Sequence, residues 1–142
     1  MLGQDRCFTL LETALAACQC DQAEVILTVT DQSLTRFAES VIHQNVAERN
    51  ARVAVRTVMG KRIGAARGNQ LSPEAVQSVA RQAQALAPLS APDPEFVSLP
   101  EPAQILQVRS FAEATADSTP EERAAQVRSI VEVAQEQNCT AS

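Results

Sequence analysis

The chain has 142 residues, of which 45% are apolar and only 3% are aromatic, and its formal net charge at pH 7 is −5. A chain of this length fits one domain, residues 1–142, and can bury a core without disulfides or metal ions. The acidic total argues against a protein that binds polyanions over its whole surface. No apolar run approaches the roughly 20 residues of a bilayer span, and the N-terminus lacks the pattern of a signal peptide. We therefore expect a cytoplasmic protein.

The first thirty residues predict a helix followed by a strand. Over residues 5–18 the apolar positions recur at helical spacing, which predicts one buried stripe. The stripe consists of Leu10, Leu11, Ala14, Leu15 and Cys18. The next segment, CDQAEVILTVTD, is dense in β-branched residues, and Val25, Leu27 and Val29 alternate with the residues between them. This alternation predicts a strand with one covered face.

Residues 34–66 alternate short apolar runs with turn signals, as an antiparallel meander does. The predicted strands are 34–38, 41–48, 51–59 and 61–66, and the predicted turns are Glu39-Ser40, Arg49-Asn50 and Met59-Gly60. Connections of two residues force neighbouring strands to run antiparallel. Gly64, inside the last of these strands, indicates a bulge or the close approach of another backbone.

A second helix is predicted in GNQLSPEAVQSVARQAQALAP. Ser72 can cap it, Pro73 suits its first position, and Glu74 faces the positive end of the helix dipole. Its apolar stripe consists of Val76, Val79, Ala80, Ala83 and Leu86. Residues 88–102 are rich in proline but too apolar for a free linker, because they include Phe96, Val97 and Leu99. We expect this segment to lie extended along the domain surface.

The C-terminal part of the chain holds the clearest helix. Residues 103–116 are ambiguous between a strand fragment and a short turn of helix. Thr119, Pro120 and Glu122 then form the start of a helix with a T-x-x-E capping box. Its predicted buried stripe consists of Ala124, Val127, Ile130, Val131 and Ala134. The final NCTAS is typical of a segment that leaves a helix to begin another strand, so we expect a fragment of a longer protein.

The whole order predicts an α+β fold, with an antiparallel meander of four to five strands and about three helices packed on one face. For catalysis the chain offers little, since His43 is its single histidine and its same-face neighbours, Val41 and Asn45, are not acids. No nucleophile elbow, HExxH motif or phosphate loop is present. We therefore expect no catalytic residue.

The four cysteines do not suggest a metal site. They are Cys7, Cys18, Cys20 and Cys139. Cys18 and Cys20 form a C-x-C, which lacks the two-residue spacer of most zinc knuckles. Reduced thiols that pack as small apolar side chains are the simpler interpretation, so we expect no metal ligand and no cofactor in this chain.

A run of cations without any acid lies between residues 49 and 67. Its members are Arg49, Arg52, Arg56, Lys61, Arg62 and Arg67. Arg52 and Arg56 share one strand face, so this part of the sheet should be locally basic. Three interpretations stay open: a solvated face balanced by acids elsewhere, a docking surface for a partner or anionic peptide, and a nucleic-acid site. The acidic total and the lack of Tyr or Trp for base stacking argue against nucleic acid.

Four motifs, in this order and spacing, resemble the N-terminal domain of the TldD/PmbA family. They are TRFAESVIHQN, the join from GKRIG to N-x-LSPE, the segment from P-x-DP to LPEP, and ATA followed by TPEERA. Members of this family are often described as modulators of DNA gyrase. The resemblance covers nearly the whole chain.

The resemblance implies a two-domain cytoplasmic protein related to metallopeptidases. One branch of the family binds zinc in a C-terminal domain that this chain lacks, and the other branch is a non-catalytic partner. Subunits pair as homodimers, or as heterodimers of paralogues, and enclose a cavity that admits unfolded peptide. None of the family's metal-binding residues has a matching position here, so the chain alone is not expected to be an enzyme.

Three functions follow as hypotheses. The leading one is a substrate-admitting, dimer-forming domain in which an exposed sheet edge binds extended peptide by strand addition. Its candidate peptide- or partner-contacting residues are Arg36, His43, Asn45, Arg52 and Arg56. The alternative is a non-enzymatic binding module for nucleic acid or DNA gyrase. The third, a self-contained hydrolase, would have to depend on His43.

Overall fold

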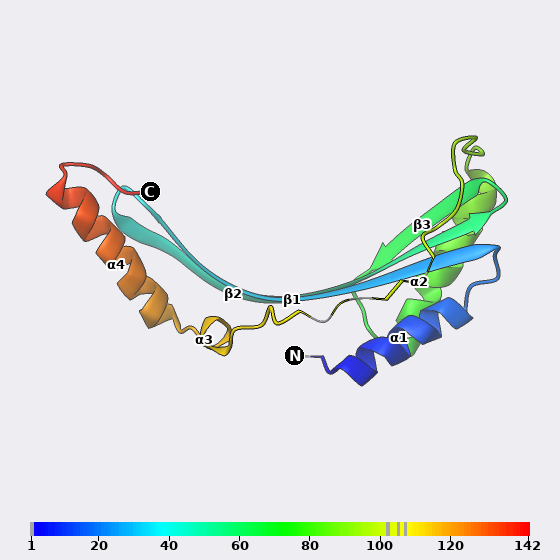
Figure 1. Ribbon diagram of the computed structural model, residues 1–142, viewed down its shortest axis with the longest axis horizontal. Helices are drawn as coiled ribbons and strands as arrows, with labels where there is room; N and C mark the ends of the chain where they lie inside the picture. Colours follow the sequence, from blue (N-terminus) through cyan, green and yellow to red (C-terminus); the bar gives the residue numbers. More distant parts are fainter. Residues whose placement is uncertain (1, 102, 105, 107) are drawn as a thin grey trace. The chain divides into compact units, whose positions relative to one another are not determined.

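The chain forms an α+β fold in the computed structural model, which describes residues 2–101, 103–104, 106 and 108–142. Its elements in chain order are α1 (Gln4–Ala16), β1 (Gln22–Ala38), β2 (Val41–Met59), β3 (Arg62–Gly68), α2 (Pro73–Leu86), the 3-10 turn η1 (Ala87–Leu89), α3 (Glu113–Ala116) and α4 (Pro120–Glu136) (Figure 1). The strands form one antiparallel sheet in the order β1-β2-β3. The predicted fold class is confirmed.

The described residues group into two compact units. Met1–Asp31 and Arg49–Ala103 make up the first, which we call the sheet unit. Gln32–Glu48 and Gln104–Ser142 make up the second, which we call the hairpin unit. β1 and β2 are long enough to contribute residues to both units.

The sheet has three strands, slightly fewer than the four to five predicted, because β1 and β2 are each continuous where a break was predicted. The turn predicted at Arg49-Asn50 lies inside β2. Asn50 is followed by Ala51 and not by the glycine that a tight hairpin turn favours. Arg49 instead forms an ion pair with Asp31 of β1 at 2.6 Å. Pairing with the neighbouring strand therefore outweighs the local turn propensity.

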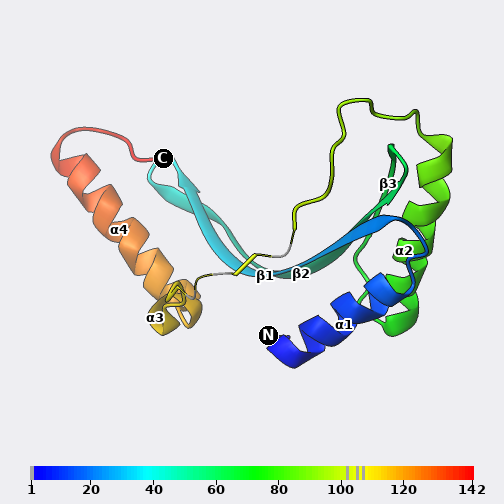
Figure 2. The same cartoon turned by 45° about the vertical axis from the view of Figure 1, so that its right-hand side comes forward.

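In the sheet unit, α1 and α2 cover one face of the sheet, and Figure 2 shows both helices on the same side of it. The core between these helices and the sheet consists of Leu10, Ala14, Val53, Val55, Val76, Val79, Ala80 and Ala83. The predicted alternation of β2 is confirmed, since Val53 and Val55 are buried while Arg52 is exposed. Leu15 and Leu86, two predicted members of the helical stripes, are instead 43% and 45% exposed, whereas Cys18 packs against the core as predicted.

Gly64 lies where the backbones of α2 and η1 approach the sheet closely. A Cβ atom at this position would overlap the carbonyl oxygen of Ala83 and the backbone nitrogen of Ala87. The pairing of β2 with β3 is regular here, with Thr57 opposite Gly64. The predicted close approach is therefore confirmed, without a bulge.

The start of α2 is capped as predicted. The Ser72 hydroxyl accepts a hydrogen bond from the backbone N–H of Ala75 at 3.2 Å, and Pro73 is the first helical residue. Hydrogen bonds from its own backbone N–H and from Ser72 lower the pKa of the Glu74 carboxyl. The negative charge of Glu74 thus meets the free N–H groups of the first turn.

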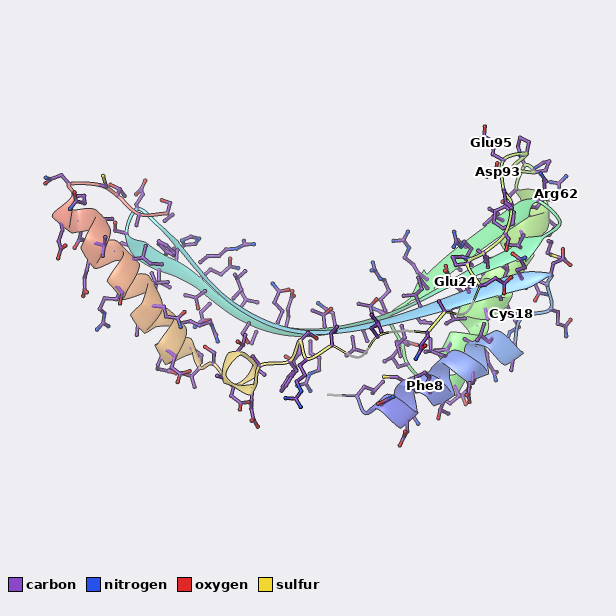
Figure 3. The ribbon with its side chains drawn as sticks, viewed as in Figure 1. Phe8, Cys18, Glu24, Arg62, Asp93 and Glu95 are labelled. Carbon is purple, nitrogen blue, oxygen red and sulfur yellow. The ribbon has the colours of Figure 1, made fainter. Side chains whose placement is uncertain are left out.

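After η1, the proline-rich segment runs extended across one end of the sheet, as predicted. The N–H of Asp93 donates to the carbonyl oxygen of Lys61 at 2.8 Å, and the N–H of Leu99 donates to Oε1 of Gln22 at 2.9 Å. The Arg62 guanidinium donates to the carbonyl oxygen of Ser90, and Figure 3 labels Arg62 beside this segment. The described part of the segment is thereby fixed on the sheet unit.

The hairpin unit joins α4 to the hairpin formed by the ends of β1 and β2. The predicted capping box is present, since Glu122 N–H donates to Thr119 Oγ1 at 3.2 Å and Thr119 N–H donates to Glu122 Oε2 at 2.8 Å. At its other end, α4 closes in a Schellman motif, with Asn138 at φ 53° and the N–H of Cys139 bonded to the carbonyl oxygen of Ala134 at 2.8 Å.

The chain then returns to the hairpin turn. Glu39 and Ser40 form this turn with φ angles of 51° and 63°, a conformation that costs free energy for residues other than glycine. Ser40 N–H donates to the carbonyl oxygen of Ala141 at 3.0 Å, and Ala141 N–H donates to Ser40 Oγ at 3.3 Å. These bonds help to hold the strained turn.

Few apolar side chains of the hairpin unit are buried. Among its described residues, only Val127 and Ala141 belong to the buried hydrophobic set, at 8% and 9% exposure. The predicted stripe of α4 is therefore wrong at Ile130, which is 52% exposed. In the ambiguous stretch, α3 supplies the predicted short turn of helix, and the described residues there form no strand, while 105 and 107 lie outside them.

Removal of the capping box should loosen α4. We expect Thr119→Ala to lower the local unfolding free energy of α4 by about 1 kcal/mol, because the Glu122 N–H loses its acceptor. Native-state hydrogen exchange of the α4 amides measures this. Ser129→Ala, in the middle of the same helix, is the control and should leave exchange unchanged or slightly slower. Equal effects of the two changes would contradict a role for the cap.

Candidate functional site

The face of the sheet opposite α1 and α2 carries a hollow of about 320 Å³ within the sheet unit. All three strands line it, and Figure 3 labels one lining residue, Glu24 of β1. The lining consists of Glu24, Ile26, Thr28, Arg52, Ala54, Val55, Arg56, Ala65, Ala66 and Arg67. The hollow arises from the sequence because the small side chains Ala54 and Ala65 lie between longer ones on the same face.

Three arginines and one glutamate set the charge of the hollow. Arg56 forms an ion pair with Glu24 at 3.0 Å between Nη2 and Oε2. Arg67 lies opposite Ala54 in the register of β2 and β3, so its diagonal neighbours on β2 are Arg52 and Arg56. The carboxylate of Glu24 offsets one of the three positive charges. The Nε atom of Arg56 is buried and has no hydrogen-bond partner among the described residues.

This chemistry suits binding and not catalysis. The lining residues include no histidine or cysteine, and the Thr28 hydroxyl has no general base beside it in the lining. Guanidinium groups present several N–H donors in a planar fork that matches a carboxylate or a phosphate. The hollow can therefore hold an anionic group against a small apolar floor.

The remaining cations of the basic run are engaged elsewhere. Arg49 pairs with Asp31, as described, and Lys61 Nζ donates to the carbonyl oxygen of Pro94 at 2.6 Å. The Arg62 guanidinium binds carbonyl oxygens of the proline-rich segment. Because four of the six cations of the run, including Arg56, are bound to partners within the chain, the run does not form the continuous positive stripe that nucleic-acid backbones favour.

The five residues predicted from the sequence fall into separate places. Arg52 and Arg56 lie together in the hollow. Arg36 lines a smaller hollow of about 220 Å³ in the hairpin unit and donates to Oε1 of Gln44 at 3.3 Å. Asn45 Oδ1 accepts a hydrogen bond from Nη2 of Arg123 at 3.2 Å. His43 is exposed, and its side chain makes no hydrogen bond or ion pair with the part of the chain that the structure describes.

The other two charged residues of the hollow, Glu24 and Arg67, are not among the predicted site residues. Glu24 lies in the predicted strand, among the residues that alternate with Val25, and Arg67 ends the basic run. The alternation of residues 24, 26 and 28 could have placed Glu24 on the uncovered face. Arg67 could not be placed without the register that sets it opposite Ala54.

The described residues do not offer a metal site. No group of three or more histidine, cysteine, aspartate or glutamate side chains among them could hold a metal ion. The donor set of these residues therefore does not fit zinc. Likewise, no helix in the described ranges is long and apolar enough to cross a bilayer.

The cysteines are free thiols that differ in exposure. Cys139 is exposed, whereas Cys7, Cys18 and Cys20 are partly buried. Burial raises the pKa of the Cys18 thiol, and the neighbouring Cys20 raises it further. Cys18 Sγ also donates a hydrogen bond to the carbonyl oxygen of Ala14 at 3.4 Å.

These thiols should differ in reactivity. We expect iodoacetamide at neutral pH to alkylate Cys139 first and Cys18 at least about tenfold more slowly, because the raised pKa and partial burial of Cys18 reduce its reactive thiolate. Peptide mass spectrometry over a time course gives both rates. In urea the difference should disappear, and equal rates in the folded protein would contradict the prediction.

Comparison with known proteins identifies relatives of this fold. Residues 23–87 match the family model described as PmbA/TldA metallopeptidase domain 1, a range that contains every lining residue of the hollow. TldE from Thermococcus kodakarensis superposes with a TM-score of 0.78 at 21% identity, over 93% of this chain and 29% of that protein. A proposed modulator of DNA gyrase from Bacteroides thetaiotaomicron superposes with a TM-score of 0.65 at 14% identity, over 94% of this chain and 32% of that protein.

The chain thus spans about a third or less of the length of these two proteins. At such identities the likeness establishes the shared fold. No curated protein matches the sequence.

Proposed function

We propose that the chain is the substrate-admitting and dimerisation domain of a PmbA/TldD-family zinc metallopeptidase or of its non-catalytic partner, since residues 23–87 match the model of the family's first domain. On this proposal it pairs with a second copy or a paralogous subunit in the cytoplasm and admits unfolded peptide. The zinc ion belongs to a part of the protein outside this sequence.

The observation that carries the proposal is the poor core of the hairpin unit. Its exposed apolar side chains far outnumber its two buried ones, Val127 and Ala141. The exposed set consists of Val41, Ile42, Leu106, Val108, Phe111, Ile130 and Val133. Each such side chain gains roughly 1.5–3 kcal/mol when it is fully removed from water. A second subunit that covers this surface would supply the burial that the unit lacks by itself.

The sheet supports the admission of peptide. β3 is an edge strand in the described order β1-β2-β3, so its outer edge has no strand beside it. An extended peptide can pair with such an edge through main-chain hydrogen bonds that do not depend on sequence. This binding mode suits unfolded substrates of varied sequence.

Two measurements test the proposal. Sedimentation velocity over a concentration series should show self-association, or association with the paralogous subunit. Val133→Glu should weaken it at least about tenfold by placing a charge in the covered surface. Gln135→Glu, which adds the same charge elsewhere on α4, is the control. A chain that stays monomeric alone and in the mixture would contradict the dimerisation role.

The peptide role is tested by hydrogen exchange. An unstructured peptide in excess should slow the exchange of β3 amides, Arg62–Gly68, while those of α4 keep their rates. Absence of both binding and protection would contradict the admission of peptide. The dimerisation role would still be tested separately by sedimentation velocity.

A further inference from the structure

The hollow on the uncovered sheet face has an excess of positive charge that the chain itself does not neutralise. Among the described residues, the side chains of Arg52 and Arg67 form no ion pair, and Glu24 is engaged with Arg56. Like charges held on neighbouring strands repel one another unless an opposite charge lies between them. The geometry therefore favours a carboxylate placed among Arg52, Arg56 and Arg67.

An extended chain already lies on this face. Gln22 has the same strand alternation as Glu24 and Ile26, so its side chain points to the uncovered face. Gln22 Oε1 accepts the N–H of Leu99, which places that part of the proline-rich segment on the same face as the hollow. Val58, which alternates with the core residues of β2, is nevertheless 1% exposed and is thus covered on this face.

The hollow, on the same face, stays open. Its floor residues, Ala54 and Ala65, have short side chains, so that a volume of about 320 Å³ stays open between the arginines and Ile26. This volume accommodates a side chain or two but not a folded element. The face that binds one extended segment of this chain thus also offers an open hollow to side chains of a second extended polypeptide.

We propose that this hollow binds an acidic side chain of an extended polypeptide, so that the domain prefers unfolded peptides with glutamate or aspartate. The inference rests on the proposed function, since the ligand is the peptide that the domain admits. A strand added beside β3 would lie about 4.8 Å from it and would place every second side chain on the hollow's face. Arg67 of β3 is then its nearest cation, and Arg52 and Arg56 lie one strand further in.

The test uses two labelled peptides of equal length in which Glu alternates with Ser or Gln alternates with Ser. We expect fluorescence anisotropy to show at least about tenfold tighter binding of the Glu peptide, since charged hydrogen bonds to guanidinium groups are the strong ones. Salt should reduce this preference, because the arginines are partly exposed. The double variant Arg52→Gln/Arg67→Gln should lose the preference but bind the Gln peptide as before.

Two further variants keep the test decisive. Arg6→Gln/Arg81→Gln removes the same charge from exposed positions of α1 and α2 and should keep the preference. Glu24→Gln removes the competing carboxylate and should tighten binding of the Glu peptide about threefold, a gain that misfolding cannot imitate.

The outcomes separate this inference from the proposed function. Equal binding of the two peptides, with β3 protected, would overturn the acidic preference and leave peptide admission intact. No binding of either peptide would overturn both. An oligonucleotide of matched charge that binds through Arg52 and Arg67 more tightly than the Glu peptide would also overturn the inference, because the hollow would then serve phosphate.

Discussion

Gly64→Ala should destabilise the sheet unit by about 3 kcal/mol, a larger loss than we expect from any of the other proposed substitutions. The new Cβ would overlap the Ala83 carbonyl oxygen and the Ala87 nitrogen and would come within 2.9 Å of the Ala87 Cα atom. All three are backbone atoms, so no rotamer change relieves the overlap. Either α2 and η1 must move away from β3 or the two strands must separate, and both open the core.

Urea unfolding, followed by far-UV circular dichroism and by exchange of the sheet-unit amides, measures the loss. Gly68→Ala is a graded control, because its Cβ would meet side chains and no backbone, Val79 Cγ2 at 2.8 Å and Val53 Cγ1 at 4.0 Å, and should cost about 1 kcal/mol. Gly3→Ala has open space around it and should cost about 0.5 kcal/mol or less as an N-cap change. The three equal losses that a general glycine effect predicts would contradict a specific α2–β3 contact.

The close approach at Gly64 was predictable, because a glycine inside a strand usually marks a bulge or a site where another backbone comes close. The same holds for the two helix starts, at Ser72 and Thr119. Capping depends on hydrogen bonds between residues two or three positions apart, so the local sequence contains all of the information. Features of this kind were predicted to the residue.

The strand breaks were mispredicted because continuity depends on a partner that is distant in sequence. Nothing within residues 45–53 reveals that Arg49 will pair with Asp31 on the neighbouring strand. β1 and β2 support each other along their length, so that a weak turn signal inside either strand is overridden. A predicted two-residue turn is present at Glu39 and Ser40, where the chain reverses direction between β1 and β2.

The hollow was predicted only in part, because some of its residues come from strands that are distant in sequence. Period-two alternation places Arg52 and Arg56 on one face, and this is visible in the sequence. Their counterpart Glu24 and their neighbour Arg67 come from other strands, and only the register brings them together. Similarly, helical periodicity marks Ile130 as apolar but cannot tell whether a surface covers it. Burial on α4 is decided by tertiary packing, which in the hairpin unit is sparse.

This sparse packing makes a single arginine important. We expect Arg123→Met to lower the local unfolding free energy of the hairpin unit by about 2 kcal/mol, because its core offers little compensation. Arg123 Nε donates to Thr35 Oγ1 at 3.2 Å and Nη2 donates to Asn45 Oδ1 at 3.2 Å, so one side chain of α4 binds both strands. Nη1 also donates to the Ser118 carbonyl oxygen at 2.6 Å, just before the helix begins.

Hydrogen exchange distinguishes this local loosening from general instability. Amides of α4 should exchange about thirtyfold faster in Arg123→Met, as expected for 2 kcal/mol, while those of Val53 and Val55 keep their protection. Arg128→Met on the same helix is the matched control, because Arg128 is exposed and makes no hydrogen bond or ion pair with other described residues. Equal loss of protection in both units would contradict a local role of Arg123, because the substitution would then have destabilised the whole chain. If a second subunit covers the unit as proposed, its addition should restore most of the lost protection, since binding to the folded state supplies free energy that the missing guanidinium no longer gives.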